Sequence, residues 1–277
     1  MPAATEPDVT SRPTALLPLR QLGLISVYWF GINAVWGGYE WFGQEQIQLI
    51  VGVGARGLTT GILETLGALV AIVTVPTVGV ISDYTTTRFG KRKGYIITGA
   101  FFDLVFLGGL AMLAMAKPPG WDGEALGSAG LLAVYALLFL SLQLSSNVSQ
   151  GPYQGYVPDL VAEPLVGLAS GAVGVMRTLG NIAGAVVMLT IGNALGQWGL
   201  ALILIGVVEF TLAALTFFFV LEGPRGKPRE GRSWRSIAGE AWGLDVLRER
   251  SFLRMTTVRF LFLLGTGIFI NVSKWYL

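Results

Sequence analysis

Long apolar segments alternate with short polar ones along the chain. Seven apolar segments reach the length of about 20 residues that a helix needs to cross a ~30 Å hydrocarbon core. They cover residues 22–51, 59–82, 95–116, 129–155, 165–192, 198–221 and 254–277. A lone strand in lipid would leave its backbone N–H and C=O groups without partners, so each segment is predicted to be an α-helix. The pattern therefore predicts an all-α, polytopic membrane protein.

The polar segments divide the chain into four parts. A tail over residues 1–21 precedes a six-helix transmembrane bundle over 22–222, and a linker over 223–253, rich in Gly, Pro and Arg, leads to a seventh transmembrane helix over 254–277. A single helix after a complete bundle and a long linker has no obvious packing partner. We therefore expect the chain to be the N-terminal half of a longer protein with the start of its C-terminal half. A dimer of such halves is the alternative.

The composition supports membrane insertion and narrows the chemistry. Of the 277 residues, 53% are hydrophobic and 13% are charged, which is about half the charged fraction that is usual in a soluble domain. The chain has no Cys and no His, which excludes disulfides, thiolate nucleophiles and metal sites built on those ligands. A proton carried through this protein would have to bind to Asp or Glu, and we expect no metal or other cofactor.

The basic residues predict the orientation in the membrane. If the N-terminus is cytoplasmic, 14 of the 19 Lys and Arg residues fall in cytoplasmic segments, and only Arg56 and Lys117 fall in outside loops. Cytoplasmic loops of membrane proteins carry an excess of Lys and Arg. We therefore expect an integral protein of a plasma or inner membrane with a cytoplasmic N-terminus.

A charged hairpin separates the second and third apolar segments. In “GVISDYTTTRFGKRKGYI”, residues 79–96, Asp83 stands at the C-terminal end of the second predicted helix, where the helix dipole disfavours an anion by up to about 1 kcal/mol. Arg88, Lys91 and Arg92 follow closely and are expected to compensate the charge of Asp83. The alternative is that these basic residues only fix the topology.

This hairpin resembles a known signature. Its pattern G-x-x-x-D…R-x-G-K-R-K is similar to the loop between helices two and three of the major facilitator superfamily, and the spacing in “SDYTTTRFGKRK” resembles the sucrose carriers and the glycoside–pentoside–hexuronide cation symporters. “QGPYQGYVPDLV”, “LASGAVGVMRTLGNIAG” and “VRFLFLLG” resemble the end of helix four, helix five and the start of helix seven in that group. Two features depart from it: Gly94 replaces the usual proline, and the acidic pair on helix two that marks sodium-coupled sugar symporters is not evident.

The resemblance implies a fold and a conformational latch. The fold would be the six-helix N-terminal half of a major-facilitator bundle plus a seventh transmembrane helix. The aspartate and arginine of the hairpin would form a charge cluster with helix eleven of the other half, which lies outside this chain, and would hold the outward-open state. The residues implied for this latch are Gly79, Asp83, Arg88, Gly90 and Arg92.

Each ionisable residue deep in a predicted helix raises the free energy of membrane insertion by at least ~2.5–3.5 kcal/mol. Such residues are therefore expected to have a structural or functional role. Arg177 lies about 18 Å from the start of the fifth helix, so it should face the bundle interior and a carboxylate. Glu40 and Glu64 lie in the outer halves of the first and second helices. Helices one, two and five line the cavity in the family, so we predict that Arg177 pairs with Glu40 or Glu64 to bind a polar substrate or carry the coupled proton. A buried structural salt bridge is the alternative.

Helix four carries a polar stripe. Its members Gln143, Asn147, Gln150 and Gln154 recur three to four positions apart and therefore share one face. Such a stripe suits the hydroxyl groups of a sugar, which need donors and acceptors together. The alternative is hydrogen bonding between helices. Asn181 lies one turn beyond Arg177 and is expected to orient it.

Other polar and aromatic residues are expected to be structural. Asp103 and Glu209 belong to helices three and six, which lie away from the cavity in the family, and we interpret them as structural, protonated hydrogen-bond donors. Most aromatic residues of the first helix are expected at the lipid interfaces, with stacking on a sugar as the alternative for Trp36 or Tyr39. These aromatic residues are Tyr28, Trp29, Phe30, Trp36, Tyr39, Trp41 and Phe42.

Together these features favour a secondary active transporter that moves a small polar solute, such as a sugar or glycoside, by alternating access. The coupled cation would be a proton rather than sodium. Efflux of a drug or metabolite by antiport is one alternative, and a non-transporting membrane scaffold or pigment-delivery protein of the same fold is another. No nucleotide-binding loop, metal cluster or nucleophile–base pair is visible in the sequence, so the chain is not expected to be an enzyme. The expected partners are the solute, the cation, the lipid bilayer and the C-terminal half, with no nucleic acid.

Overall fold

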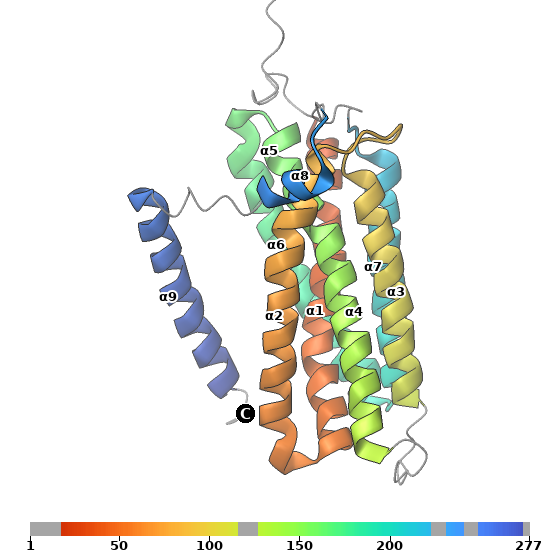
Figure 1. Ribbon diagram of the computed structural model, residues 1–277. Helices are drawn as coiled ribbons and strands as arrows, with labels where there is room; N and C mark the ends of the chain where they lie inside the picture. Colours follow the sequence, from red (N-terminus) through yellow and green to blue (C-terminus); the bar gives the residue numbers. More distant parts are fainter. Residues whose placement is uncertain (1–17, 116–126, 223–230, 241–248, 274–277) are drawn as a thin grey trace, which may run out of the picture.

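The computed structural model describes residues 18–115, 127–222, 231–240 and 249–273. Six long helices form a bundle (Figure 1): α1 (Leu19–Val51), α2 (Val53–Asp83), α3 (Lys93–Met115), α4 (Gly127–Gln154), α6 (Val166–Val187) and α7 (Trp198–Phe219). The shorter elements are α5 (Tyr156–Leu160), η1 (Glu163–Leu165), α8 (Trp234–Glu240) and η2 (Met188–Ala194), a π-helix that continues α6. No strand occurs among the described residues, and the prediction of an all-α protein is confirmed.

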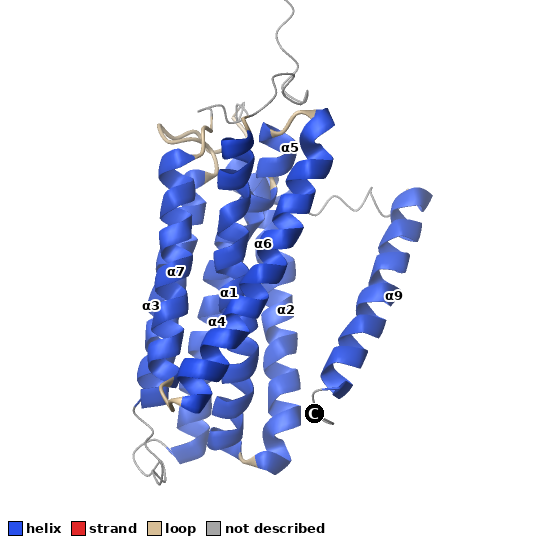
Figure 2. Ribbon diagram, turned by 180° about the vertical axis from the view of Figure 1, so that it is seen from behind, coloured by secondary structure: helices blue, strands red, loops and turns tan. Residues whose placement is uncertain are grey.

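Among the residues that the structure describes, five helical segments are long and apolar enough to cross a membrane, by length and composition alone. They are Val53–Asp83, Lys93–Met115, Ser128–Leu160, Glu163–Ala194 and Trp198–Phe219. Each coincides with a segment predicted from the sequence and begins within six residues of the predicted start. α1 and α9 (Arg250–Ser273) lie at the other two predicted segments and are not among the five. In two opposite views, α9 stands apart from the bundle (Figure 2).

The long helices alternate in direction, which brings particular helix ends together. The last residues of α2, α4 and α7 and the first residues of α1, α3 and α6 lie at the upper end of the bundle in Figure 1. We call it the basic end because Lys91, Arg92 and Lys93 lie there. The charged hairpin and the end of α4 are therefore neighbours, although the sequence separates them widely.

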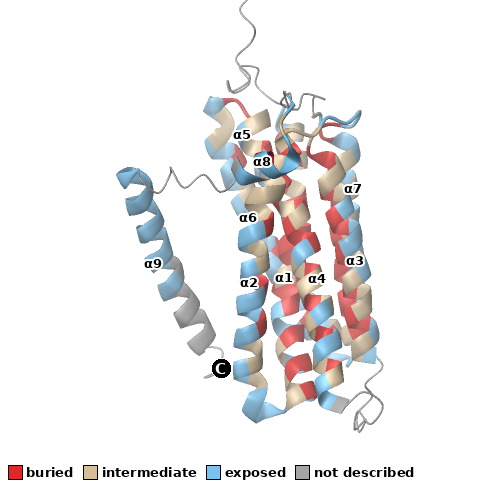
Figure 3. Ribbon diagram, viewed as in Figure 1, coloured by how far each residue is buried: buried red, intermediate tan, exposed pale blue. Residues whose placement is uncertain are grey.

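α1 is the central helix of the bundle. It packs against α6 and α7 and also contacts α2 and α4, and buried residues run along it through the middle of the molecule (Figure 3). Its side chains Tyr28, Trp29, Tyr39 and Phe42 are at most 5% exposed. The prediction that most aromatic residues of this helix lie at the lipid interfaces is wrong for these four, because a helix surrounded by others uses its rings to fill the core. Trp41, in contrast, is exposed.

Glycine residues bring α1 and α6 into backbone contact. Gly180 and Gly184 of α6 are four positions apart, and a Cβ atom added to either would overlap with the carbonyl oxygen of Phe30 or of Ala34 in α1. Small residues at this spacing let membrane helices approach closely. One side of α6 is therefore fixed against the central helix, and the exposed side chain of Arg177 lies over Trp29 of that same helix.

The other long helices pack in a similar way. α2 packs on α4, and α3 packs on α4 and α7. A Cβ atom on Gly151 of α4 would lie 2.6 Å from the carbonyl oxygen of Val75 in α2. The outer face of α2 remains exposed and apolar, through Leu58, Ile62, Leu66, Leu69, Ile72 and Val73. This face is thus open to lipid or to another protein segment.

Candidate functional site

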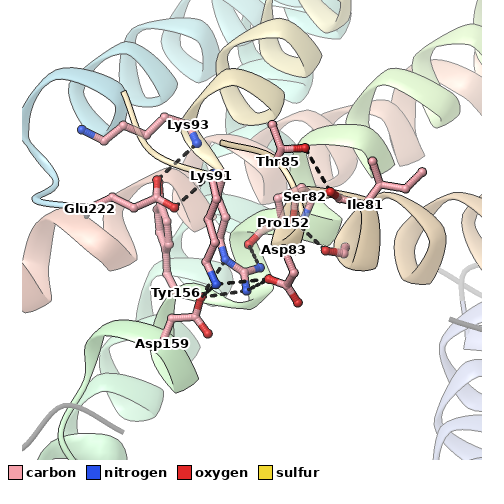
Figure 4. Close-up of polar contacts among 12 residues, drawn as sticks. Ile81, Ser82, Asp83, Thr85, Lys91, Lys93, Pro152, Tyr156, Asp159 and Glu222 are labelled. Carbon is pink, nitrogen blue, oxygen red and sulfur yellow. Dashed lines mark hydrogen bonds and ion pairs between the residues drawn. The ribbon is translucent and has the colours of Figure 1, made fainter. Parts of the chain in front are cut away.

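The charged hairpin forms an ion-pair cluster at the basic end (Figure 4). α2 ends at Asp83, and Lys91 Nζ and Arg92 Nη2 lie 3.2 Å and 2.8 Å from its Oδ1 atom. The same two nitrogens lie 2.6 Å and 2.9 Å from Oδ2 of Asp159 in α5. We call Asp83, Lys91, Arg92 and Asp159 the hairpin cluster. Its two acids and two bases balance in charge, so the anion at the end of α2 is compensated as the sequence predicted.

Arg92 makes the most contacts in the hairpin cluster. Its side chain is 6% exposed, and all three of its guanidinium nitrogens donate hydrogen bonds. Nε donates to Asp159 at 3.0 Å, Nη2 donates to both acids, and Nη1 donates to the carbonyl oxygen of Pro152 at 2.8 Å. A planar guanidinium suits several fixed acceptors better than an ammonium does. Arg92 therefore joins the start of α3 to the ends of α2 and α4 and to α5.

Glu222 holds the same hairpin from the end of α7. Its carboxylate accepts the backbone N–H groups of Arg92 at 3.0 Å and Lys93 at 3.3 Å, and the hydroxyl group of Tyr156 at 3.2 Å. The first N–H groups of a helix have no partner within it, so Glu222 caps the N-terminus of α3 from another helix. Burial raises the pKa of the Glu222 carboxyl group, while the hydrogen bond from the Arg92 backbone opposes this rise.

The two glycine residues implied for the latch lie at contacts with other elements of the bundle. Gly90 has a φ angle of +119°, and a Cβ atom there would lie 2.7 Å from Oε2 of Glu222. Both the backbone angle and the space therefore favour glycine at this position. A Cβ atom on Gly79 would lie 3.8 Å from the carbonyl oxygen of Gly151, so Gly79 lies at the contact between α2 and α4.

Arg88, also implied for the latch, lies apart from the hairpin cluster. Its side chain is exposed, and its guanidinium carbon lies over the ring of Phe89, 4.5 Å from the ring centroid. Lys91, rather than Arg88, accompanies Arg92 at the two carboxylates.

Four groups that complete the site were not predicted from the sequence: the acceptors Asp159, Glu222 and the Pro152 carbonyl oxygen, and the donor Tyr156. They lie 60 to 130 positions from Arg92. One signal was present, because the hairpin has four bases and a single acid, which leaves positive charge to be balanced from elsewhere. Asp159 lies in “QGPYQGYVPDLV”, a stretch noted for its resemblance and not for its charge.

The intramembrane residues Arg177, Glu40 and Glu64 do not form the predicted pair. The guanidinium of Arg177 lies over Trp29 of α1, 5.0 Å from the ring centroid. Glu40 follows Trp29 by eleven residues on α1, which is about 16 Å along a helix. Glu64 lies near the hydrogen-bonded hydroxyl groups of Tyr39 and Tyr135, far along α1 from Trp29. The structure thus does not bring Arg177 together with either acid, although all three side chains are exposed on the bundle surface.

The polar stripe of α4 is partly used within the bundle. Asn147 is 5% exposed, and its Nδ2 donates to the backbone oxygen and to Oε1 of Gln143 at 2.6 Å and 3.2 Å. Gln143 itself lies against α2, where a Cβ atom on Gly67 would lie 2.8 Å from its Nε2. The two hydrogen bonds of Asn147 lie within α4, and the Gln143 side chain lies at the contact of α4 with α2, so sugar binding and hydrogen bonding between helices both stay predictions for these residues. Gln150 is partly exposed, and Asn181 is exposed one turn beyond Arg177.

No group of three or more Asp or Glu residues suited to a metal ion occurs in the part of the chain that the structure describes. The ion pairs at the basic end connect the ends of α2, α3 and α5 and can separate when those ends move.

Comparison with known proteins agrees with this geometry. The chain matches the family model described as “MFS/sugar transport protein” over residues 47–277. It is similar to sucrose transport protein SUT1 of Oryza sativa subsp. japonica, at 29% identity over 158 residues, and to sucrose transport protein SUC4 of Arabidopsis thaliana, at 26% identity over 123 residues. These matches cover 53% and 43% of this chain, but only 29% and 24% of the two relatives. No solved structure matches the chain significantly.

The family match covers far more than half of the chain and includes the hairpin, the polar stripe and Arg177. It confirms the resemblance that the hairpin and the fourth and fifth predicted helices suggested. The all-α bundle with its apolar spans is of the kind this family has. The chain belongs to the MFS/sugar transport protein family, a family of membrane transporters.

Proposed function

We propose that this chain is part of a secondary active transporter that moves a small polar solute, a sugar or a glycoside, by alternating access and together with protons. The family match and the two relatives named as sucrose transport proteins support a sugar as the solute. The chain has no His, so its proton carriers would be carboxylates. The missing acidic pair on the second helix argues against sodium as the coupled ion.

The hairpin cluster is the observation that carries this proposal. Lys91, Asp83 and Asp159 are 18%, 25% and 28% exposed. The ion pairs of Lys91, which solvent reaches, contribute only about 1 kcal/mol or less each, so they can separate at little cost. Arg92 is 6% exposed, so its guanidinium would have to reach water or keep one of its two acids when the helix ends separate. The cluster connects α2, α3 and α5, and its opening would free these helix ends to move. This suits a latch that is closed in one state of a transport cycle and open in another.

The solute would bind on the exposed side of α1, α2 and α6. Glu40, Glu64 and Arg177 place two acids and one base on these helices. Such groups, with the nearby amide of Asn181, supply the donors and acceptors that sugar hydroxyl groups need. Gln150 of α4 would contribute from the basic end of the bundle, and a C-terminal half would complete the site.

The basic end would face the cytoplasm, because Lys and Arg are enriched on that side of membranes. The chain has no Cys, so single introduced thiols can be labelled without background from this chain. In intact cells, an impermeant maleimide should label Ala55→Cys at the opposite end of the bundle. It should label Thr86→Cys in the hairpin only after permeabilisation. The reverse pattern would overturn the orientation.

Proteoliposomes containing the full-length protein test the function directly. Radiolabelled sucrose should accumulate inside several-fold above equilibrium when the outside is acidic, and a protonophore should abolish this accumulation. If a sodium gradient alone drives accumulation, the coupled ion is sodium and not the proton. Failure of several sugars and glycosides to enter under either gradient would contradict the proposal, and export of preloaded solute would favour efflux.

A further inference from the structure

Two acidic side chains meet in the interior of the bundle, away from the hairpin cluster. Asp103 of α3 and Glu209 of α7 are both 0% exposed. Their carboxyl groups lie within hydrogen-bonding distance of each other, between two helices that are closely packed. One acid inside a membrane-spanning helix is already costly, so two in contact require a specific reason.

Neutral hydroxyl groups surround the pair. Ser145 of α4 donates a hydrogen bond to Oδ1 of Asp103, and the hydroxyl group of Tyr28 in α1 lies 3.3 Å from Oε1 of Glu209. The Tyr28 hydroxyl group also lies 3.0 Å from Oγ of Ser149. These contacts satisfy one oxygen of each acid, and they come from the two helices that cover the α3–α7 contact.

The neighbouring helices offer no positive charge to the pair. In the described residues, neither carboxyl group contacts a Lys or Arg side chain. Tyr28 of α1 and Tyr153 of α4 are the other titratable groups there, and the hydroxyl group of Tyr153 donates to the carbonyl oxygen of Ile25. Two carboxylates in contact without a nearby base cannot both keep their charge.

Among the described residues, one oxygen atom of each acid has no hydrogen-bond donor. Asp103 Oδ2 and Glu209 Oε2 are buried and have no hydrogen-bond donor among the described groups. An ionised carboxylate only accepts hydrogen bonds, so two carboxylates that face each other cannot satisfy one another. A single added proton makes one oxygen a donor and leaves the other as its acceptor.

The close packing leaves little room for anything larger than a proton. A Cβ atom on Gly31 of α1 would lie 2.9 Å from Cα of Glu209. A Cβ atom on Gly99, one turn before Asp103, would lie 2.6 Å from the Ser149 side chain. Glycine at both positions brings α1 and α4 directly against the helices that carry the pair.

We propose that Asp103 and Glu209 bind a shared proton and form a proton site inside the six-helix bundle, separate from Arg177 and from the hairpin cluster. A proton from water binds to one carboxylate oxygen, and the charge of the pair falls from two negative to one. The bound proton connects α3 to α7, whereas its loss places two like charges in contact. The site needs only the folded bundle and does not depend on the proposed transport function.

Infrared spectroscopy of the full-length protein in nanodiscs tests this proposal, because a protonated carboxyl group has a C=O band well separated from carboxylate bands. At neutral pH, the Glu209→Gln and Asp103→Asn variants should each lose such a band. The matched control Glu45→Gln, which replaces an exposed acid of α1, should keep it. A wild-type spectrum without a band that depends on these two acids would overturn the proposal. Replacing choline chloride with sodium chloride in the buffer should not change the C=O band. If the band disappears in sodium chloride, the two acids bind a metal cation rather than a proton.

The pH dependence of stability gives a second measurement. The melting temperature of the wild-type protein should fall as the pH rises through release of the shared proton, because the folded state then loses a bound proton. In Glu209→Gln the amide N–H group donates at every pH, so the variant should show less than about half of this dependence. Equal pH dependence in the two proteins would overturn the proposal. If Glu209→Gln does not fold, the same melting measurement is made on Asp103→Asn. The pH titration of the wild-type infrared band then tests release of the shared proton directly.

Discussion

Arg92 and Asp159, 67 positions apart in the sequence, are joined by two hydrogen bonds to a single oxygen: Nε donates to Oδ2 at 3.0 Å and Nη2 at 2.9 Å. Nη2 also donates to Asp83, and Nη1 donates to the Pro152 carbonyl oxygen. These contacts depend on the shape of the guanidinium group as well as on its charge. They connect four chain segments through one nearly buried side chain.

The first prediction follows from this geometry. Arg92→Lys keeps the charge but cannot reach three separate acceptors, so it should destabilise the folded protein by about 2 kcal/mol. A lower melting temperature in detergent measures this loss. Arg88→Lys, at an exposed position of the same hairpin, should leave the melting temperature unchanged. Equal effects of the two substitutions would contradict the central place of Arg92.

A second prediction concerns the tight turn before α3. Gly90→Ala introduces a side chain at a φ angle of +119° and within 2.7 Å of Oε2 of Glu222. Backbone strain of this kind costs about 1–3 kcal/mol, and the displaced carboxylate would no longer cap α3. The melting temperature should therefore fall. Gly94→Ala, four residues on in α3 and open to space, should leave it unchanged or raise it, since alanine favours helix. A variant at position 90 as stable as the wild type would contradict the capping contact.

The third prediction is a pH dependence at the basic end. Burial raises the pKa of Glu222 above its ordinary value of 4.5, so the folded state binds this proton more tightly than the unfolded chain does. The contribution of Glu222 to the free energy of unfolding must then fall as the pH rises from the ordinary value through the raised pKa. Glu222→Gln removes this contribution. The slope of melting temperature against pH over that window should be less negative in the variant than in the wild type, and an unchanged slope would contradict the assignment.

A fourth prediction tests the contact between α1 and α6. A methyl group on Gly184 would overlap with the carbonyl oxygen of Ala34, so Gly184→Ala should force the helices apart at a cost of about 1–3 kcal/mol. The measurement is again the melting temperature, together with the yield of monodisperse protein. Gly174→Ala, in the same helix with nothing near its Cβ position, is the matched control. Equal stability of the two variants would show that the backbones are not in contact there.

The sequence predicted the helices well because length and hydropathy decide which segments cross a bilayer. Asp83 at the end of α2 and its compensation by nearby bases were also predictable, since helix dipoles and local spacing act over a few residues. The glycine at position 90 followed from resemblance and proved necessary for a positive φ angle. The correctly predicted features therefore depend on hydropathy, helix dipoles and contacts between residues that are close in the sequence.

Contacts across the bundle were harder to predict. Asp159 and Glu222 reach the hairpin only because α4 and α7 end at the level where α3 begins, and hydropathy does not fix the relative heights of helices. The unknown relative heights of the helices also explain why the predicted pair of Arg177 and Glu40 does not form. The two residues lie about three turns apart along the bundle axis. The aromatic residues of α1 were assigned to the lipid interfaces because a central helix and a peripheral helix have similar composition.

Arg177 gives the last prediction, which concerns transport rather than stability. Its side chain is exposed on α6 and lies over the ring of Trp29, a contact that contributes only about 0.5–1 kcal/mol at an exposed site. Arg177→Gln should therefore reach the membrane at the wild-type level, and Arg177→Lys should do the same. Both should lose sugar uptake in proteoliposomes by at least about tenfold, because neither supplies the planar set of donors that we assign to the solute site. Normal uptake in both variants would remove Arg177 from that site, and the solute would then have to bind through other groups of α1, α2 and α4.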